Sequence, residues 1–268
     1  MLAAIRRWFA DNILELGREM RLSYLPPLMV YVAAGVSGLT GIVGTFFVKE
    51  YLGLSAAFLA ALAFWAGIPW ALKMPLGHLV DLIWRHKAGL VWLGASLIAA
   101  SLLIMLGLVA EPRYMSGIMS PEAWFVVSSL LSPVGYVLQD VVADAMTVEA
   151  VPRVNDQGDP LPPETRRLMN TTLQTLGRVA IIGGGVLVSL VNVVMFAGVD
   201  SLPNAERVAI YAQVYGMALV IPAISVAGVL LASLIRRREA GRLRARGFDK
   251  ATLRAMLEPP TDAVKPDW

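Results

Sequence analysis

Cysteine is absent from this 268-residue sequence, and histidine occurs only twice. The absence of cysteine excludes a disulfide framework, a thiolate nucleophile and any metal site built on cysteine. Two histidines without a cluster of further ligands argue against a zinc enzyme. Because no nucleophile–base pair or phosphate-binding loop is visible either, we expect no enzymatic activity, no metal or other cofactor, and no nucleic-acid partner.

Charged residues are also scarce. They make up 16% of the chain, whereas 57% of it is hydrophobic; soluble domains contain about 25% charged and about 45–50% apolar residues. No stretch alternates apolar and polar residues with a period of two, which excludes a transmembrane β-barrel. The composition therefore predicts an all-α membrane protein embedded in a lipid bilayer.

Six apolar stretches are long enough to cross a bilayer, which requires roughly 20 residues of helix. They cover residues 25–48, 54–80, 88–110, 121–148, 169–199 and 208–235. We therefore predict a membrane domain of six transmembrane helices over residues 22–235. The third and sixth stretches contain no ionisable residue, so we expect these two helices to be outermost.

Lysine and arginine are distributed unevenly between the connections. One side of the predicted domain has only Lys49, Arg113 and Arg207, whereas the other has most of the basic residues. The positive-inside rule therefore places both termini in the cytoplasm, for a protein of the cell inner (plasma) membrane. Residues 1–21 predict an amphipathic helix on the cytoplasmic leaflet, and residues 236–268 form a basic tail suited to anionic lipid.

Ionisable residues occur inside three of the predicted spans. Lys73 lies in the second, Asp140 and Asp144 lie one turn apart in the fourth, and Arg178 lies in the fifth. Lys73, Asp140 and Arg178 fall at a similar depth, roughly 12 Å from the cytoplasmic ends of their helices. A charge in hydrocarbon costs about 3 kcal/mol or more. We therefore expect one cluster in which Lys73 or Arg178 pairs with Asp140.

This cluster has two interpretations. It is either a lattice of salt bridges that holds the helices together, or a site for a substrate and a proton. In the second case we expect Asp140 to stay ionised beside the cations. Asp144, which we expect to have fewer partners, is then the better proton carrier.

Proline and glycine interrupt three of the spans and predict breaks in their helices. Discontinuous helices beside charged residues are typical of transport sites. The predicted breaks lie at Gly67 and Pro69, at Pro133 and Gly135, and at Pro222. In the first span, by contrast, a run of glycines (Gly35, Gly38, Gly41 and Gly44) predicts close packing of neighbouring helices.

The segment GHLVDLIWRHK (77–87) resembles the Gly-x-Leu-x-Asp…Arg/Lys signature between the second and third helices of major facilitator transporters. The matching residues include Gly77, Asp81, Arg85 and Lys87. The glycine that usually separates the aspartate from the basic residues is missing. An aspartate at a helix end and cations in a short loop can form a latch that breaks as the protein moves, so these residues are candidates for a gating loop.

Four segments are similar to the folate–biopterin transporter family of that superfamily: FFVKEYLGLS (46–55), IPWALKMPLGHLVD (68–81), QDVVADAMTVEAV (139–151) and LQTLG (173–177). The resemblance covers about residues 31–198. It implies a secondary transporter for an anionic organic solute such as a folate or pteridine, coupled to protons by symport. It also implies that Lys73, Asp140 and Asp144 handle substrate and proton, with Arg178 suiting an anionic ligand.

The resemblance implies two three-helix repeats of inverted topology, as in one half of a major facilitator transporter. The tail would then correspond to the central linker. The chain would be a truncated or split product, or a half that works as a homodimer or with a second six-helix half. The alternative function is a non-transporting membrane scaffold or assembly factor. A scaffold would tolerate Lys73→Ala and Asp140→Asn, whereas a carrier would lose uptake.

Overall fold

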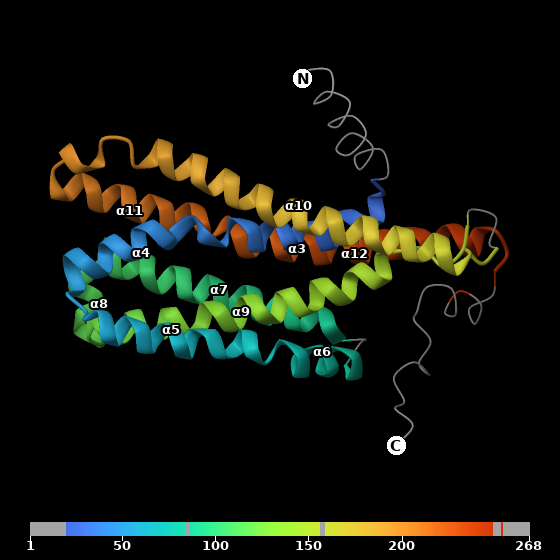
Figure 1. Ribbon diagram of the computed structural model, residues 1–268, viewed down its shortest axis with the longest axis horizontal. Coiled ribbons are helices and arrows are strands. Elements are labelled where there is room, and N and C mark those ends of the chain that lie inside the picture. Colours follow the sequence, from blue (N-terminus) through green and yellow to red (C-terminus); the bar gives the residue numbers. More distant parts are fainter. Residues whose placement is uncertain (1–19, 84–85, 156–158, 249–252, 254–268) are drawn as a thin grey trace, which may run out of the picture.

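The computed structural model describes residues 20–83, 86–155, 159–248 and 253. The chain is an all-α membrane protein, and these residues contain no strand beyond one isolated bridge between Val154 and Pro160. In this part of the chain six helices are long and apolar enough to span a membrane, which confirms the six predicted spans (Figure 1). The amphipathic helix predicted for residues 1–21 lies almost entirely outside the described residues.

The six spans divide into the following elements. The first consists of η2 (Leu22–Tyr24), α3 (Leu25–Gly35), η3 (Val36–Thr40) and α4 (Gly41–Phe47), followed by η4 (Val48–Leu52). The second consists of α5 (Ala56–Ala71) and α6 (Lys73–Leu82), and the third is α7 (Lys87–Ala110). After α8 (Pro112–Ile118) come α9 (Pro121–Ala150) and α10 (Pro163–Met195). After η6 (Val199–Ser201), α11 (Asn204–Ala218) and α12 (Val220–Ala245) form the sixth.

The second and sixth spans are each broken, at Leu72 and at Leu219, and each break lies three residues before a proline. Pro75 and Pro222 therefore fall in the first turn of the helix that follows. Proline is tolerated there because backbone N–H groups of the first turn have no intrahelical partner. The break predicted near Pro222 is confirmed, whereas the one predicted at Gly67 and Pro69 is displaced, because α5 continues through both residues to Ala71.

The break predicted in the fourth span is wrong, because α9 continues without interruption through Pro133. Gly135 instead marks a close crossing of α9 with α7. A Cβ atom on Gly135 would lie 2.6 Å from the carbonyl oxygen of Gly94, and one on Gly94 would lie 2.6 Å from that of Gly135. The missing side chains let the two backbones touch, which stabilises the helix pair.

Close packing also explains part of the glycine run in the first span. A Cβ atom on Gly35 would lie 2.5 Å from the carbonyl oxygen of Ile181, and one on Gly184 would lie 2.8 Å from the Cα atom of Gly35. These two glycines therefore allow α3 and α10 to cross. Gly38 and Gly41 are exposed, and no neighbour lies closer than about 4 Å to a Cβ at either position.

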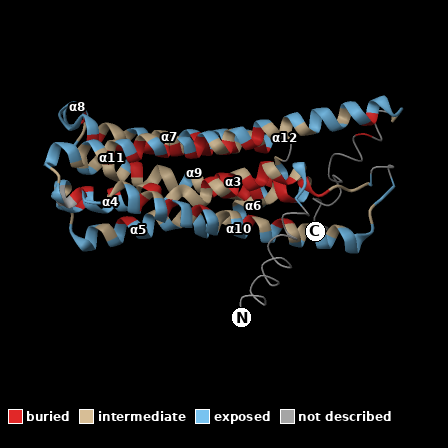
Figure 2. Cartoon of the chain, turned by 90° about the horizontal axis from the view of Figure 1, so that it is seen from above, coloured by how far each residue is buried: buried red, intermediate tan, exposed pale blue. Residues whose placement is uncertain are grey.

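The helices form three rows when the bundle is seen from above (Figure 2): α7, α11 and α12 on one side, α3 and α9 in the middle, α5 and α10 on the other. In the most apolar 18-residue stretch of each span, 6% of the residues are buried in the second span and 17% in the fifth, compared with 44% in both the third and the fourth. The expectation that the third helix is outermost is therefore wrong for this bundle. α7 packs along α9, α11 and α12, so much of its apolar surface is buried within the bundle.

The two ends of the bundle differ in charge. At the end where α10 begins and α9 ends lie the side chains that define the basic end: Lys87, Arg153, Arg166, Arg167 and Arg236. The largest apolar cluster lies towards the opposite end, where residues of α7 such as Ile98 and Leu102 are buried with Val214 and Tyr215 of α11. A second cluster, nearer the basic end, includes Tyr31 and Leu173 and joins α3 to α10.

Candidate functional site

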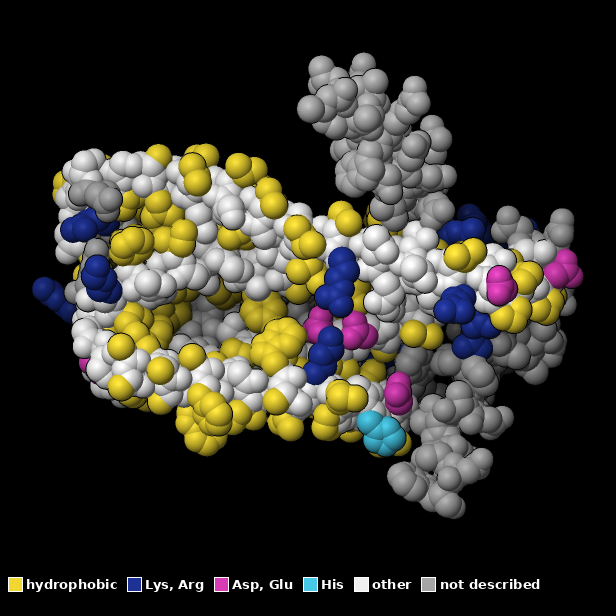
Figure 3. Space-filling view, viewed as in Figure 1, with side chains coloured by type: hydrophobic (Ala, Val, Ile, Leu, Met, Phe, Trp, Pro, Cys, Tyr) yellow, Lys and Arg dark blue, Asp and Glu magenta, His cyan; other side chains and the backbone are white. Residues whose placement is uncertain are grey.

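Acidic and basic side chains meet on one face of the bundle, at the end of a hollow between α10 and the α5–α6 ridge (Figure 3). Lys73 is the first residue of α6, directly after the break at Leu72. Asp140 and Asp144 lie on successive turns of α9 and so point to the same side of the helix. The helix break and the turn spacing together bring one cation to two carboxylates.

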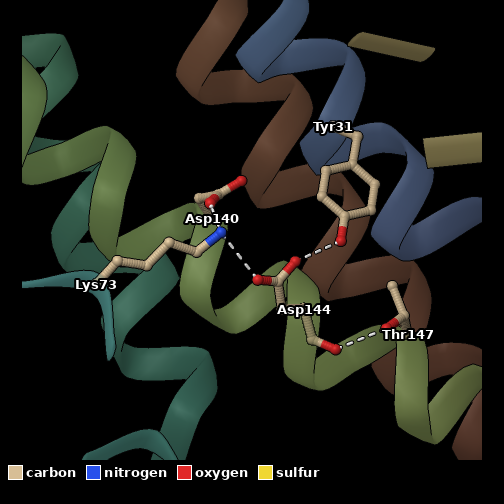
Figure 4. A network of polar contacts seen from close by, with 5 residues as sticks. All are labelled: Tyr31, Lys73, Asp140, Asp144 and Thr147. Atoms are coloured by element: carbon tan, nitrogen blue, oxygen red, sulfur yellow. Dashed lines mark hydrogen bonds and ion pairs between the residues drawn. The ribbon is translucent and has the colours of Figure 1, made fainter. Parts of the chain in front are cut away.

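Lys73 bridges these two carboxylates (Figure 4). Its Nζ atom lies 2.5 Å from Oδ2 of Asp140 and 3.0 Å from Oδ2 of Asp144. The expected pairing of Lys73 with Asp140 is confirmed, and Asp144 lies nearer the basic end. The Asp140 side chain is 11% exposed, whereas Lys73 and Asp144 are 39% and 45% exposed. The cluster therefore has a buried side at Asp140 and an open side at Asp144.

Tyr31 of α3 completes the network and was not identified from the sequence. Its hydroxyl donates a hydrogen bond of 2.6 Å to Oδ1 of Asp144. The residue is buried, and its ring packs against Gly177 of α10, where a Cβ atom would lie 2.8 Å from the ring. A tyrosine inside an apolar span needs a partner for its hydroxyl, and that requirement was the available signal.

Asp144 has more partners than the sequence suggested. It accepts from Tyr31 and pairs with Lys73, whereas Asp140 pairs with Lys73 alone among the described residues. The Asp144 backbone carbonyl also accepts a 2.7 Å hydrogen bond from Thr147. The expectation that Asp144 is the less-partnered carboxylate is wrong, because the sequence does not show that α3 carries a hydroxyl to it.

Arg178 lies beside this network without joining it. It follows Gly177 on α10, its side chain is exposed, and its charge acts on the Tyr31 hydroxyl. Arg178 forms no ion pair with any other residue that the structure describes. The site therefore combines a lysine shared by two carboxylates with a second cation that is available to a ligand.

The residues of the expected gating loop lie on two different helices, apart from one that lies outside the described residues. Gly77 and Asp81 lie on α6, Asp81 is exposed, and Arg85 lies outside the described residues. Lys87 is the first residue of α7 and is buried, and its Nζ atom pairs with Oε1 of Glu149 at the end of α9. The structure thus gives Lys87 a partner on α9, which the signature alone did not indicate.

A third residue joins this pair. Nη1 of Arg236 on α12 lies 3.4 Å from the same Glu149 oxygen. The cationic groups of α7 and α12 therefore share one carboxylate of α9 at the basic end. This contact is separate from the Lys73 cluster, which lies one turn and more away along α9.

Comparison with known proteins gives one partial similarity. No family model matches the chain, and no solved structure matches it. A stretch of 152 residues is 28% identical to a folate-biopterin transporter from Synechocystis sp.. This stretch covers 56% of the present chain but only 28% of the length of that relative.

Proposed function

We propose that this chain belongs to a secondary transporter for an anionic organic solute such as a folate or pteridine. The observation that carries the proposal is the position of Arg178, an exposed cation without an anionic partner among the described residues, beside the Lys73–Asp140–Asp144 cluster. Ionisable residues inside membrane spans are costly and usually mark the path of a substrate or ion. The partial similarity to a folate-biopterin transporter supports this cargo.

The cluster offers a physical route for an anion to be bound. The guanidinium of Arg178 can form two parallel hydrogen bonds to a carboxylate, which is a strong and specific contact. Lys73 is shared between Asp140 and Asp144, so an anion that draws Lys73 away would leave a carboxylate without its cation. A carboxylate that loses its cation binds a proton more readily. Anion binding would in this way be coupled to proton uptake.

The surroundings of the site are part of the proposal. The basic end would face the cytoplasm of the cell in its inner membrane, following the positive-inside rule. The face formed by α5 and α10 is the least buried in the bundle and includes the charged cluster. A second six-helix unit, either another copy or a partner chain, would cover this face and enclose the substrate. The α6 segment with Gly77 and Asp81, and the Lys87–Glu149 contact, would then act in gating.

Uptake of radiolabelled folate into proteoliposomes tests this function. We expect uptake by the wild-type chain, at least tenfold loss in Lys73→Ala and Asp140→Asn, and normal uptake in Lys49→Ala, whose exposed lysine lies at the opposite end. An inward proton gradient should stimulate the wild type. Absence of uptake by the wild type, or normal uptake in the two cluster variants, would contradict the proposal and favour a scaffold.

A further inference from the structure

The fifth span, α10, has three chemically different faces. Residues at intervals of four and seven form its buried face, which packs on α3 and η3: Leu173, Gly177, Gly184, Val188 and Asn192. On one side of this face the exposed residues are apolar, as at Leu187, Leu190 and Val194. That apolar side is suited to lipid.

On the other side of the buried face the exposed residues are polar. This polar flank is defined by Thr171, Gln174, Thr175 and Arg178. Successive residues of an α-helix are rotated by about 100° around its axis, so the four side chains fall within one sector about 100° wide. Since all four side chains are exposed in the bundle, the flank extends over two turns of the fifth span and presents polar groups outwards.

Neighbouring helices do not satisfy this flank. Thr171 and Thr175 donate their hydroxyl protons to carbonyl oxygens of α10 itself, at 3.1 and 3.0 Å. The side chains of Gln174 and Arg178 make no hydrogen bond or ion pair with a residue that the structure describes. An unpartnered amide or guanidinium is strongly disfavoured in hydrocarbon, the charged guanidinium most of all. The flank must therefore meet water or a polar ligand.

The polar flank connects a basic depression with the charged cluster at Lys73. At the basic end it begins in an open depression of about 490 Å³, which is lined by Arg166, Arg167 and Asn170 as well as Thr171 and Gln174. Burial, and then the charge of nearby Arg166, lowers the pKa of Arg153, so cations are crowded here. At its other end the flank reaches Arg178, which lies about 6 Å from Gln174 along the helix axis. Figure 3 shows mostly polar and backbone surface between the charged cluster and the basic end.

We propose that the polar flank of α10 lines a water-filled route for a hydrophilic anion between the depression at Arg166 and Arg167 and the Lys73–Asp140–Asp144 cluster. The arginines of the depression attract the anion from solution, since clefts lined by one sign of charge raise the local concentration of the opposite sign. Thr171, Gln174 and Thr175 replace part of its hydration, and Arg178 binds it. The identity of the anion rests on the proposed function, but the water-filled route does not.

The absence of cysteine makes a direct test possible, because every introduced cysteine is unique. Thr171→Cys and Gln174→Cys probe the polar flank. Val179→Cys and Leu187→Cys are the controls, since their native side chains are 50% and 53% exposed but lie outside the flank. Gln174 and Val179 point about 140° apart around the helix. The reagent is the anionic, membrane-impermeant methanethiosulfonate ethylsulfonate, applied to the full chain in liposomes.

We expect the two flank cysteines to react at least tenfold faster than the two controls, because methanethiosulfonates react with thiolates, which form in water. At Gln174→Cys the anionic reagent should also react faster than its cationic trimethylammonium counterpart, and Arg166→Gln with Arg167→Gln should remove that preference. Equal rates at flank and control positions, whether all fast or all slow, would overturn the proposal. Selective labelling in a chain that fails to take up folate would uphold the route and refute only the cargo.

Discussion

Replacing Lys73 is predicted to destabilise the protein more than replacing either of its partners. Its Nζ atom lies 2.5 Å from Asp140 and 3.0 Å from Asp144. Each contact is worth about 6 kcal/mol of gross attraction at an effective dielectric constant of about 20, most of which desolvation offsets. Lys73→Met removes both attractions and leaves two carboxylates one turn apart. We expect a loss of about 3 kcal/mol or more in the free energy of unfolding.

Asp140→Asn has a smaller predicted effect, because Lys73 keeps its contact with Asp144. We expect a loss of about 1–2 kcal/mol, reduced further by the partial exposure of the lysine. Denaturant unfolding in mixed micelles measures both changes, and Lys49→Met is the matched control for removing an exposed lysine elsewhere. The reasoning is refuted if Asp140→Asn costs as much as Lys73→Met, or if Lys73→Met behaves like Lys49→Met.

Three further predictions concern stability and are checked by the same unfolding measurement. Tyr31→Phe keeps the buried ring but removes the donor to a carboxylate, so it should cost about 1.5–3 kcal/mol; an unchanged stability would contradict the assigned hydrogen bond. Gly94→Ala should cost about 1–3 kcal/mol through backbone overlap, whereas Gly183→Ala, in open space, should stabilise by up to about 1 kcal/mol. Lys87→Met should cost about 3–5 kcal/mol, since it leaves a largely buried carboxylate at Glu149 with only its longer contact.

The spans and the break near Pro222 could be predicted from the sequence, because both depend on local chemistry. Apolar length sets the spans, and a proline in the first turn of a new helix accompanies the breaks at Leu72 and Leu219. The first of these was placed too early, at Gly67 and Pro69, which lie inside α5. The break predicted at Pro133 and Gly135 is wrong. A glycine close to a proline in the sequence allows either a helix break or a close helix contact, and only the position of α7 decides between them.

The site was only partly predictable for a similar reason. Depth along a helix follows from the rise per residue, and this placed Lys73 at the level of Asp140. The rotation of each helix and the distances between helices depend on packing. The sequence therefore did not show that Tyr31 reaches Asp144, or that Arg178 lies beside the cluster without an ion pair to a described residue.

Equilibrium binding of radiolabelled folate to the purified chain tests the central claim, that Arg178 beside the Lys73 cluster binds an organic anion. Arg178→Gln should raise the Kd at least tenfold, which corresponds to about 1.4 kcal/mol and matches the loss of a charge-assisted contact. Arg113→Gln, which removes an exposed arginine at the opposite end, should leave the Kd unchanged. An equal Kd in all three proteins, or no saturable binding to the wild type, would contradict the claim.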